Sequence, residues 1–460
     1  MKYSFLSLVF AVLPLISMSQ SANDILNVLV EQKYVKQEIA DSLRAEFAIK
    51  QQAALSDKKL RIDAEFRPRA EYRNGYQQLR NDTSTAAFFV GQRFRISANY
   101  VFDNRFVMQF SVQDLRVWGQ QDPRSTAATL QIFEGWVEPI ITNKFSVRIG
   151  RQRLVYDNQR LFSENDWRIN AAVHDAVNFR LNTGKVTSEL ALAFNQSSDK
   201  YFGTDYSPSG FTNYKFLAVN YLRYKPSNLL TLTALNSTDA FQKASDPEKM
   251  NFRYTLGGRI EVDYGRIYST LAAWYQGGKN PTGKDLSAFY LQPELRYTAS
   301  KGLVARFGAE IFSGTGNGSP SPTDHSFVPL YGTAHRFNGS MDLITKFPGD
   351  VSGAGLVNPY LFLTRPLSAK FDLRADFHTF HLQRNYYSND KKIDKYLGFE
   401  NDFLITWKPN SITKVDLGIS YMLPTESFQI VKKSGNSEYN LTWIYLGLTF
   451  KPQLLGLNFK

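Results

Sequence analysis

The stretch that most constrains the fold is LRIDAEFRPRAEYRNG, residues 60–75, because its charges recur at every second position. The charged residues are Arg61, Asp63, Glu65, Arg67, Arg69, Glu71 and Arg73. In a β-strand, alternate side chains point to opposite faces of the sheet. The stretch therefore predicts a strand with one charged face and one uncharged, mostly apolar face. Such a strand suits either a soluble antiparallel sheet or the wall of a water-filled membrane barrel.

The chain from residue 59 onward distinguishes these two alternatives. One alternating strand follows another, and several are longer than the five or six residues typical of soluble strands. Short turns, such as FDNR (102–105) and NTGK (182–185), alternate with long polar stretches such as QSSDKYFGTDYSPSGFT (196–212). Outer-membrane barrels have this rhythm, with short periplasmic turns and long external loops.

The number of strands depends on how the Gly-, Ser- and Pro-rich region 313–354 is interpreted. Counting NGSMDLITKF (338–347) as a strand gives about 19 strands, and counting it as loop gives about 18. Single-chain bacterial barrels have even numbers of strands. We therefore predict an all-β fold, a transmembrane antiparallel β-barrel of about 18 strands over residues 59–460. Region 313–354 is then one long extracellular or inward-folded loop.

The cost of charge in lipid decides which face of the first strand points inward. An Arg that faces lipid at mid-membrane costs roughly 2–4 kcal/mol, so the four arginines of residues 60–75 would cost on the order of 10 kcal/mol. The charges must therefore face the lumen. The lumen and solute-binding candidates are Arg67, Arg69, Arg93, Arg95, Arg148, Arg151, Arg160 and Arg259, with the acidic neighbours Asp63, Glu65, Glu261 and Asp263. The alternative is that many of these residues form salt bridges that only hold the shape of the wall.

The N-terminus does not belong to this pattern. Lys2, an apolar run over residues 4–18 and the small-x-small site at 17–19 predict a secretory signal peptide, residues 1–19. Residues 20–58 place Ile39, Leu43 and Phe47 at helical spacing and predict a short periplasmic helical segment, which could self-associate or bind a periplasmic partner. Since the chain is secreted, its formal net charge of +12 is not expected to serve nucleic acid.

No motif in the sequence predicts catalysis, a cofactor or a metal. SGTGNGS, at 313–319, lacks the context of a phosphate loop, and there is no G-x-S-x-G elbow. His378 and His381 differ by three positions, so a regular strand sends them to opposite faces and a chelate is not expected. We therefore do not expect an enzyme, although the sequence leaves open a hydrolase built from separate strands.

Two segments resemble the alginate-export family of outer-membrane barrels. The first, IGRQRLVYDNQRLFSENDWRINAAVHDAV, carries the family-like residues Gly150, Arg151, Gln152, Tyr156, Gln159, Arg160, Asp166 and Trp167. The second, LYGTAHRFNGSMD, carries His335, Phe337, Gly339 and Asp342, and the opening strand resembles the R-x-R-x-E start of the family. The resemblance covers most of residues 59–450. It implies an 18-stranded barrel whose arginine-rich lumen passes an anionic polyuronate.

The sequence thus predicts a channel in the outer membrane of a Gram-negative cell. Its expected partners are membrane lipid and a hydrophilic, anionic solute or polysaccharide. The alternative is a structural or assembly barrel plugged by residues 313–354, with a periplasmic partner bound by residues 21–58. A measurement of conductance separates these two hypotheses.

Overall fold

In the computed structural model the described residues are 30, 35–55, 58–122, 124, 129–204, 206, 213–243 and 245–459. The predicted signal peptide and the first part of the predicted helical segment lie outside the described residues. The chain divides into two compact units, one of residues 1–59 with 458–460 and one of residues 60–457. No helix within the described part of the chain is long and apolar enough to cross a membrane.

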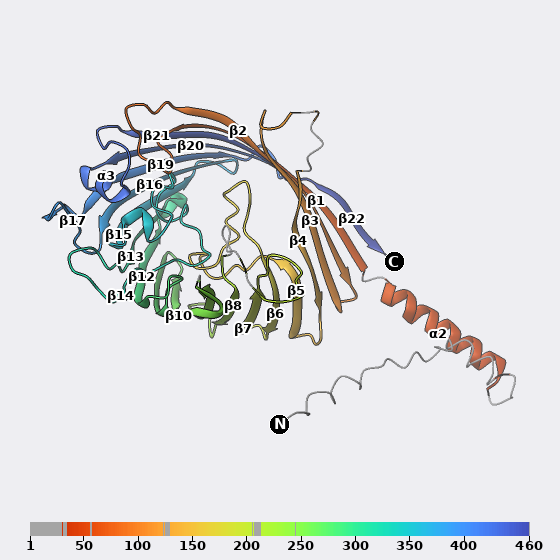
Figure 1. Cartoon of the computed structure of the whole chain (residues 1–460). Helices are drawn as coiled ribbons and strands as arrows, with labels where there is room; N and C mark the ends of the chain where they lie inside the picture. Colours follow the sequence, from red (N-terminus) through yellow and green to blue (C-terminus); the bar gives the residue numbers. More distant parts are fainter. Residues whose placement is uncertain are drawn as a thin grey trace, which may run out of the picture. The chain divides into compact units, whose positions relative to one another are not determined.

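The larger unit is a closed antiparallel barrel in which each strand pairs with its neighbours in sequence (Figure 1). Eighteen strands form the wall, which confirms the even count. The first nine are β1 (Lys58–Asn74), β2 (Ala87–Phe102), β3 (Phe106–Val117), β4 (Leu130–Pro139), β5 (Phe145–Gln152), β6 (His174–Asn182), β7 (Val186–Phe194), β8 (Phe216–Tyr224) and β9 (Leu230–Lys243). The others are β10 (Asp246–Tyr264), β11 (Ile267–Lys279), β12 (Asp285–Thr298), β13 (Val304–Phe312), β15 (Leu356–Pro366), β16 (Phe371–Leu382), β19 (Tyr396–Trp407), β20 (Thr413–Pro424) and β21 (Leu441–Phe450).

The barrel closes between its first and last wall strands. β1 pairs with β21 from Phe66 opposite Phe450 to Asn74 opposite Thr442. After this seam the chain adds β22 (Gln453–Phe459), which also pairs with β1. The sequence had suggested no role for these last residues. Closure leaves no wall strand with an unpaired edge, as a sheet in hydrocarbon requires.

Smaller elements lie outside the wall. The N-terminal helix α2 (Gln37–Leu55) confirms the predicted helical segment, and its Asp41 and Arg44 pair one turn apart. The connections hold β14 (Thr323–Asp324), β17 (Tyr387–Ser388), β18 (Lys391–Lys392), η1 (Ser300–Gly302), η2 (Gly349–Val351) and α3 (Glu426–Lys432). Residues 338–347 form no strand, as the even count required.

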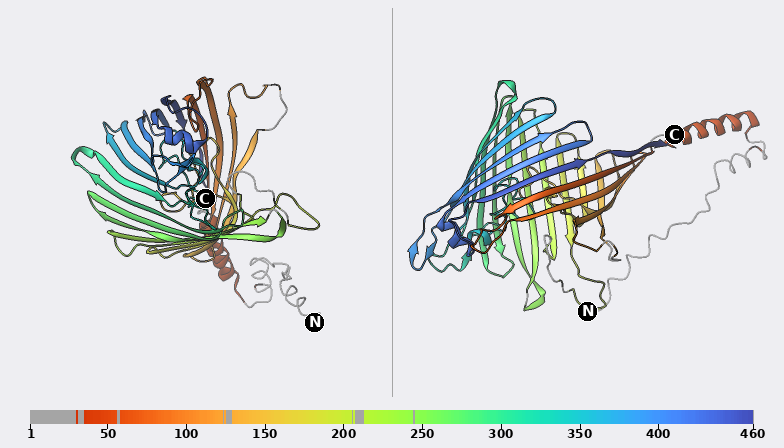
Figure 2. Two further views of the ribbon diagram at one scale, coloured as in Figure 1. Left: turned by 60° about the vertical axis from the view of Figure 1, so that its left-hand side comes forward. Right: turned by 90° about the horizontal axis from the view of Figure 1, so that it is seen from above.

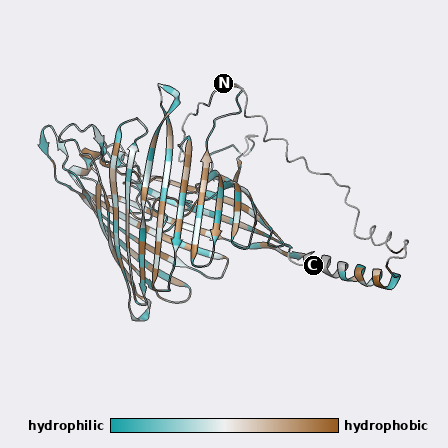
Figure 3. Ribbon diagram, turned by 90° about the horizontal axis from the view of Figure 1, so that it is seen from below, coloured by the Kyte–Doolittle hydropathy of each residue, from teal (hydrophilic) through white to brown (hydrophobic). Residues whose placement is uncertain are grey.

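The two faces of the wall differ as the alternation predicts. Along β10, the exposed fractions of Arg253, Tyr254, Thr255 and Leu256 are 4%, 38%, 0% and 47%. Figure 3 shows the resulting alternation of apolar and polar colour along the strands. In β1, Glu65 and Glu71 are buried while Tyr72 is exposed, so the charged face of the opening stretch points inward. Aliphatic and aromatic residues thus form the lipid-facing surface.

The interior is not an empty tube. The long connections 153–173 and 313–355 turn back into the barrel, where Figures 1 and 2 show them running between the walls. We call them the first and the second lumen segment. Leu154, Phe162, Phe327 and Leu343 from these segments pack in one apolar cluster with wall residues such as Trp443. The prediction of one inward-folded loop was therefore incomplete, since two segments fold inward.

Replacing Leu256 by Arg tests the assignment of the faces. Leu256 lies near the middle of the outward-facing run from Phe252 to Tyr264. We expect Leu256→Arg to lower the free energy of unfolding by roughly 2–4 kcal/mol, because the guanidinium would face hydrocarbon. Urea unfolding in lipid vesicles measures this, with Leu256→Met as the control. Equal unfolding midpoints for the two variants would contradict the assignment.

Candidate functional site

All but one of the wall arginines predicted to line the lumen face inward, and carboxylates pair with most of these. Arg93 is fully buried, and its Nε donates to Glu65 over 2.7 Å. Arg148 lies 2.7 Å from Glu138, and its guanidinium covers the ring of Trp136. These pairs hold the strands together and leave little charge for a solute.

Three further predicted residues on the wall, Arg259, Glu261 and Asp63, are also paired. Arg259 lies 3.3 Å from Glu261 on its own strand. Asp63 lies 2.7 Å from Arg61 near the start of β1, and Asp263 is exposed at the end of β10 that leads into a short turn. Their positions agree with a charged inner face, while their partners explain the mixture of acidic and basic residues in the sequence.

The first lumen segment is bound to the wall by four of the predicted arginines. The carboxylate of Asp166 lies 3.2 Å from Arg67, 2.8 Å from Arg93 and 3.8 Å from Arg95. Arg69 donates to the carbonyl oxygen of Trp167 over 3.0 Å, and its guanidinium lies 4.3 Å from the centre of the Trp167 ring. The arginine-rich opening strand therefore serves mainly to hold this segment.

The second lumen segment is bound to the wall at two strands, β11 and β19. At β11 the Gln276 side chain bonds both the N–H and the carbonyl oxygen of Val328, at 2.9 and 2.8 Å. At β19 Glu400 accepts from the N–H of Met341 at 2.8 Å. The segment is therefore attached to the wall at both of these strands.

The two lumen segments pair with each other inside the barrel. Phe162 and Tyr331 form a parallel β-bridge. The N–H of Tyr331 donates to the carbonyl oxygen of Leu161 over 2.9 Å, and the N–H of Ser163 donates to that of Tyr331 over 3.1 Å. A Cβ at Gly332 would lie 1.8 Å from the carbonyl oxygen of Arg160, so this approach requires glycine.

Arg160 fixes this junction to the wall. Its guanidinium lies 2.8 Å from Glu310 and donates to the carbonyl oxygen of Thr333 and to the Asn338 side chain, each over 2.6 Å. Arg160 and Glu310 are almost completely buried. Arg160, predicted as a solute-binding residue, is thus engaged in holding both segments and strand β13.

The joined segments border two cavities in the lumen. The outer cavity, of about 780 Å³, is lined by Arg168, by Asn280 to Thr282 in a long connection, and by Lys346. The inner cavity, of about 370 Å³, is lined by Arg336 and by wall residues including Arg374 and Tyr445. His335 belongs to the lining of both cavities, so it stands at the boundary between them.

His335 is held in place by two contacts. Its ring stacks on Trp167 with centres 4.1 Å apart and planes within 7°, and its Nδ1 lies 2.8 Å from the Asp342 carboxylate. Burial by itself would raise the pKa of the Asp342 carboxyl. The charge and hydrogen bond of His335 and the hydrogen bond from Tyr76 outweigh burial, and the pKa lies below its ordinary value. Asp342 therefore remains an anchoring carboxylate at neutral pH.

Three cations that a solute could reach lie on the lumen segments. Arg168 and Lys346 line the outer cavity and Arg336 lines the inner one, and all three side chains are exposed. Among the residues that the structure describes, no carboxylate oxygen lies within 4.0 Å of their side-chain nitrogens. Partial burial, and then the charges of Arg306 and Arg374, lower the pKa of the Arg336 guanidinium, so positive charge is crowded at this point.

The sequence analysis did not predict these three residues, although two of them lie next to residues that carry the family resemblance. Arg168 directly follows Asp166 and Trp167, and Arg336 directly follows His335, in the two segments that carry the family resemblance. The alternation of side chains along a strand could not predict the orientation of these three residues, because they lie in connections between strands. Only the path of the segments through the barrel brings them to the lumen.

The assignment of Arg151 to the lumen was wrong. Arg148 faces inward, and a residue three positions later must face outward on a regular strand. Arg151 pairs at 3.0 Å with Asp175, which lies directly opposite it on β6. The neighbour of Asp175, His174, is buried against Tyr214 inside the barrel, so Asp175 and Arg151 lie on the outer face.

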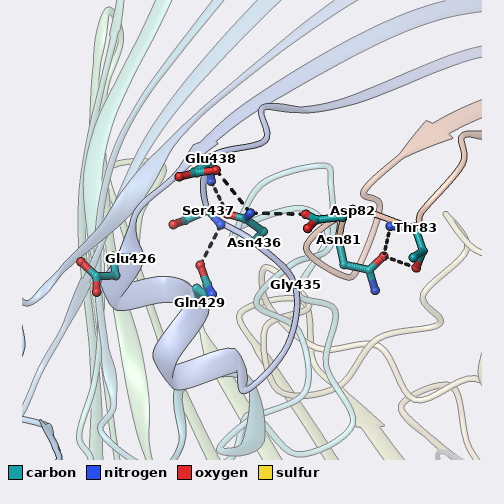
Figure 4. Close-up of a pocket in the computed structure, with 9 residues that line it drawn as sticks. All are labelled: Asn81, Asp82, Thr83, Glu426, Gln429, Gly435, Asn436, Ser437 and Glu438. Carbon is teal, nitrogen blue, oxygen red and sulfur yellow. Dashed lines mark hydrogen bonds between the residues drawn. The ribbon is translucent and has the colours of Figure 1, made fainter.

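Another cavity, of about 850 Å³, lies among the long connections and is shown in Figure 4. Its polar side chains bond one another: Asn436 donates to Asp82 over 3.5 Å, and Gln429 accepts from the N–H of Ser437 over 2.9 Å. Nothing in this arrangement selects a ligand. Within the described ranges, no group of three or more His, Cys, Asp or Glu side chains could hold a metal ion.

Comparisons with known proteins agree with the barrel. A family model described as alginate export matches residues 58–434. No curated protein matches the chain. Solved structures that resemble it include OccK11 (OpdR) of Pseudomonas aeruginosa, with 11% identity and a TM-score of 0.57 over 86% of this chain and 96% of that one. OccAB1 of Acinetobacter baumannii has 11% identity and a TM-score of 0.58 over 86% and 97% of the two chains.

A third similar structure is OpdK of Pseudomonas aeruginosa with vanillate, with 9% identity and a TM-score of 0.56 over 86% of this chain and 99% of that one. At these identities the similarity concerns the fold. The comparison covers nearly the whole length of all three solved chains, which agrees with a single large barrel here.

Substitution of Arg160 tests whether the junction is structural. Arg160→Met leaves the buried Glu310 without its cation, a change that costs about 3–5 kcal/mol in buried pairs. We expect the lumen segments to loosen, seen as noisier single-channel currents and faster proteolysis within residues 153–173. Arg116→Met is the control, because it removes an exposed pair with Asp114, and exposed ion pairs contribute little to stability. Quiet currents in Arg160→Met would contradict this role.

Proposed function

The chain belongs to the alginate-export family of outer-membrane barrels, and on that basis we propose that it is a channel selective for hydrophilic, anionic solutes. The family and the fold identify the chain as an outer-membrane β-barrel channel that resembles the Occ porins. Anion selectivity is the part that we infer.

The observation that carries this proposal is the position of Arg168, Arg336 and Lys346. The predicted wall arginines that face the lumen are mostly neutralised by carboxylates or engaged by the lumen segments. These three side chains are exposed to the cavities and have no such partner among the residues that the structure describes. Fixed positive charge in a narrow lumen raises the local concentration of anions. A similar structure, OpdK, is described with vanillate, which is a carboxylate, and this agrees with an anionic solute.

The apolar packing of the lumen segments favours a second candidate, a plugged structural or assembly barrel. Phe162, Phe327 and Leu343 pack in a continuous apolar cluster with the wall, as in the core of a soluble domain. In this case residues 21–58, following a signal peptide over residues 1–19, would bind a periplasmic partner. Purified protein that conducts no ions in a planar bilayer would favour this candidate. Neither candidate involves catalysis.

The reversal potential in a salt gradient tests anion selectivity. We expect the wild-type channel to prefer chloride over potassium, and the triple substitution Arg168→Gln, Arg336→Gln and Lys346→Gln to abolish most of that preference. The measurement belongs at about 0.1 M salt or below, where the Debye length is about 10 Å or more.

Arg151→Gln provides the matched control, because this arginine lies on the outer face and is paired with Asp175. It should leave the reversal potential unchanged. A wild-type channel that shows no preference, or a triple variant that keeps the full preference, contradicts the proposal.

A further inference from the structure

The two lumen segments divide the lumen into the outer and the inner cavity, and they are attached to the wall at several strands. The first segment is bound at Asp166 to β1 and β2, the second at Val328 to β11 and at Met341 to β19, and Arg160 joins both to β13. Most of these contacts are buried. A solute must therefore pass beside the joined segments, through the cavities that they leave.

The inner cavity has the size of a site for one small molecule. Its volume of about 370 Å³ lies near the lower end of the range of roughly 300–1,000 Å³ found for ligand pockets. A polymer that threads the channel would need a continuous passage past His335, which lines both cavities and is fixed between Trp167 and Asp342.

The lining of the inner cavity combines three kinds of group. Arg336 supplies an exposed cation without a carboxylate partner, next to a salt bridge of 2.5 Å between Arg374 and Asp376. Trp167 and Tyr445 supply aromatic rings, whose centres lie 5.1 Å apart. Ser420 and Asp402 supply a hydroxyl and a carboxylate.

These groups match the parts of a sugar acid. A guanidinium binds a carboxylate, carboxylate and hydroxyl oxygens accept from sugar hydroxyls, and aromatic rings pack against the apolar face of a sugar ring. A neutral sugar would leave Arg336 without an anion, and a purely apolar acid would make no use of Asp402 and Ser420.

We propose that the inner cavity binds one small hydroxylated carboxylate, such as a single sugar acid, through Arg336, and that the joined lumen segments exclude threading of a polymer. This inference rests on the proposed function, since it takes the barrel to be an anion channel. It differs from what the family resemblance implies, which is passage of a polyuronate.

The test uses the full-length protein in proteoliposomes and in planar bilayers. Glucuronate is expected to enter the vesicles and to interrupt single-channel currents, while its methyl ester and glucose interrupt them on the order of tenfold more weakly, since they lack the charge that a charged hydrogen bond requires. A long polyuronate is expected to stay outside. The wild-type protein alone suffices for these comparisons.

Variants then assign the effect to Arg336. Arg336→Gln should weaken interruption by glucuronate on the order of tenfold, Arg336→Lys should restore part of it, and Arg151→Gln on the outer face should change nothing. Correct folding is checked by resistance of the barrel to heat in detergent.

The outcomes separate the inference from the proposed function. A channel without anion preference overturns both. An anion-selective channel that lets the polyuronate enter the vesicles, or in which glucuronate and its methyl ester act equally, overturns only the inference. An amino acid that interrupts the current more strongly than glucuronate would also overturn it, because the recognised solute would then be a zwitterion.

Discussion

The cost of placing an arginine against hydrocarbon, roughly 2–4 kcal/mol at mid-membrane, determines how the whole barrel is arranged. It sends the charged face of β1 inward, where Glu65, Arg67, Arg93 and Asp166 meet. Unpaired, these charges would be costly in a narrow interior, so they neutralise one another and bind the first lumen segment. Most of the predicted wall arginines are therefore used in assembly, and the lumen segments supply further cations.

The lumen segments contribute to selectivity because they carry charge where no partner among the described residues reaches it. Arg168 and Arg336 are placed on either side of the boundary at His335, and the contacts of Asp166, Arg160 and Glu400 keep the backbone that carries them in position. The contacts that hold the segments inside the lumen therefore also hold Arg168 and Arg336 at the two cavities. In this account the family-like residues of the two segments are mainly those that join the segments to the wall.

The sequence predicted the fold well and the site poorly, for physical reasons. Strand alternation depends on local geometry alone, so the charged face of residues 60–75, the even strand number and the opposite faces of His378 and His381 could be deduced. His378 is buried inside, while His381 packs against Tyr396. The prediction for Arg151 was wrong because Arg151 lies three positions after the inward-facing Arg148, and a regular strand sends these two side chains to opposite faces. The positions of Arg168 and Arg336 in the lumen depend on how two connections far apart in the sequence meet. The periodicity of the sequence carries no information about that meeting.

The most direct test of the central claim uses the absence of cysteine from the chain. Arg168→Cys and Arg336→Cys introduce single thiols, and an anionic thiol reagent is applied from one side of a planar bilayer at a time. The account predicts that the thiol at 168 reacts from the side of the long connections and the thiol at 336 from the side of the short turns. Each reaction should shift the reversal potential toward cation preference. Reaction of both thiols from the same side only, or no change in selectivity after modification, would contradict it.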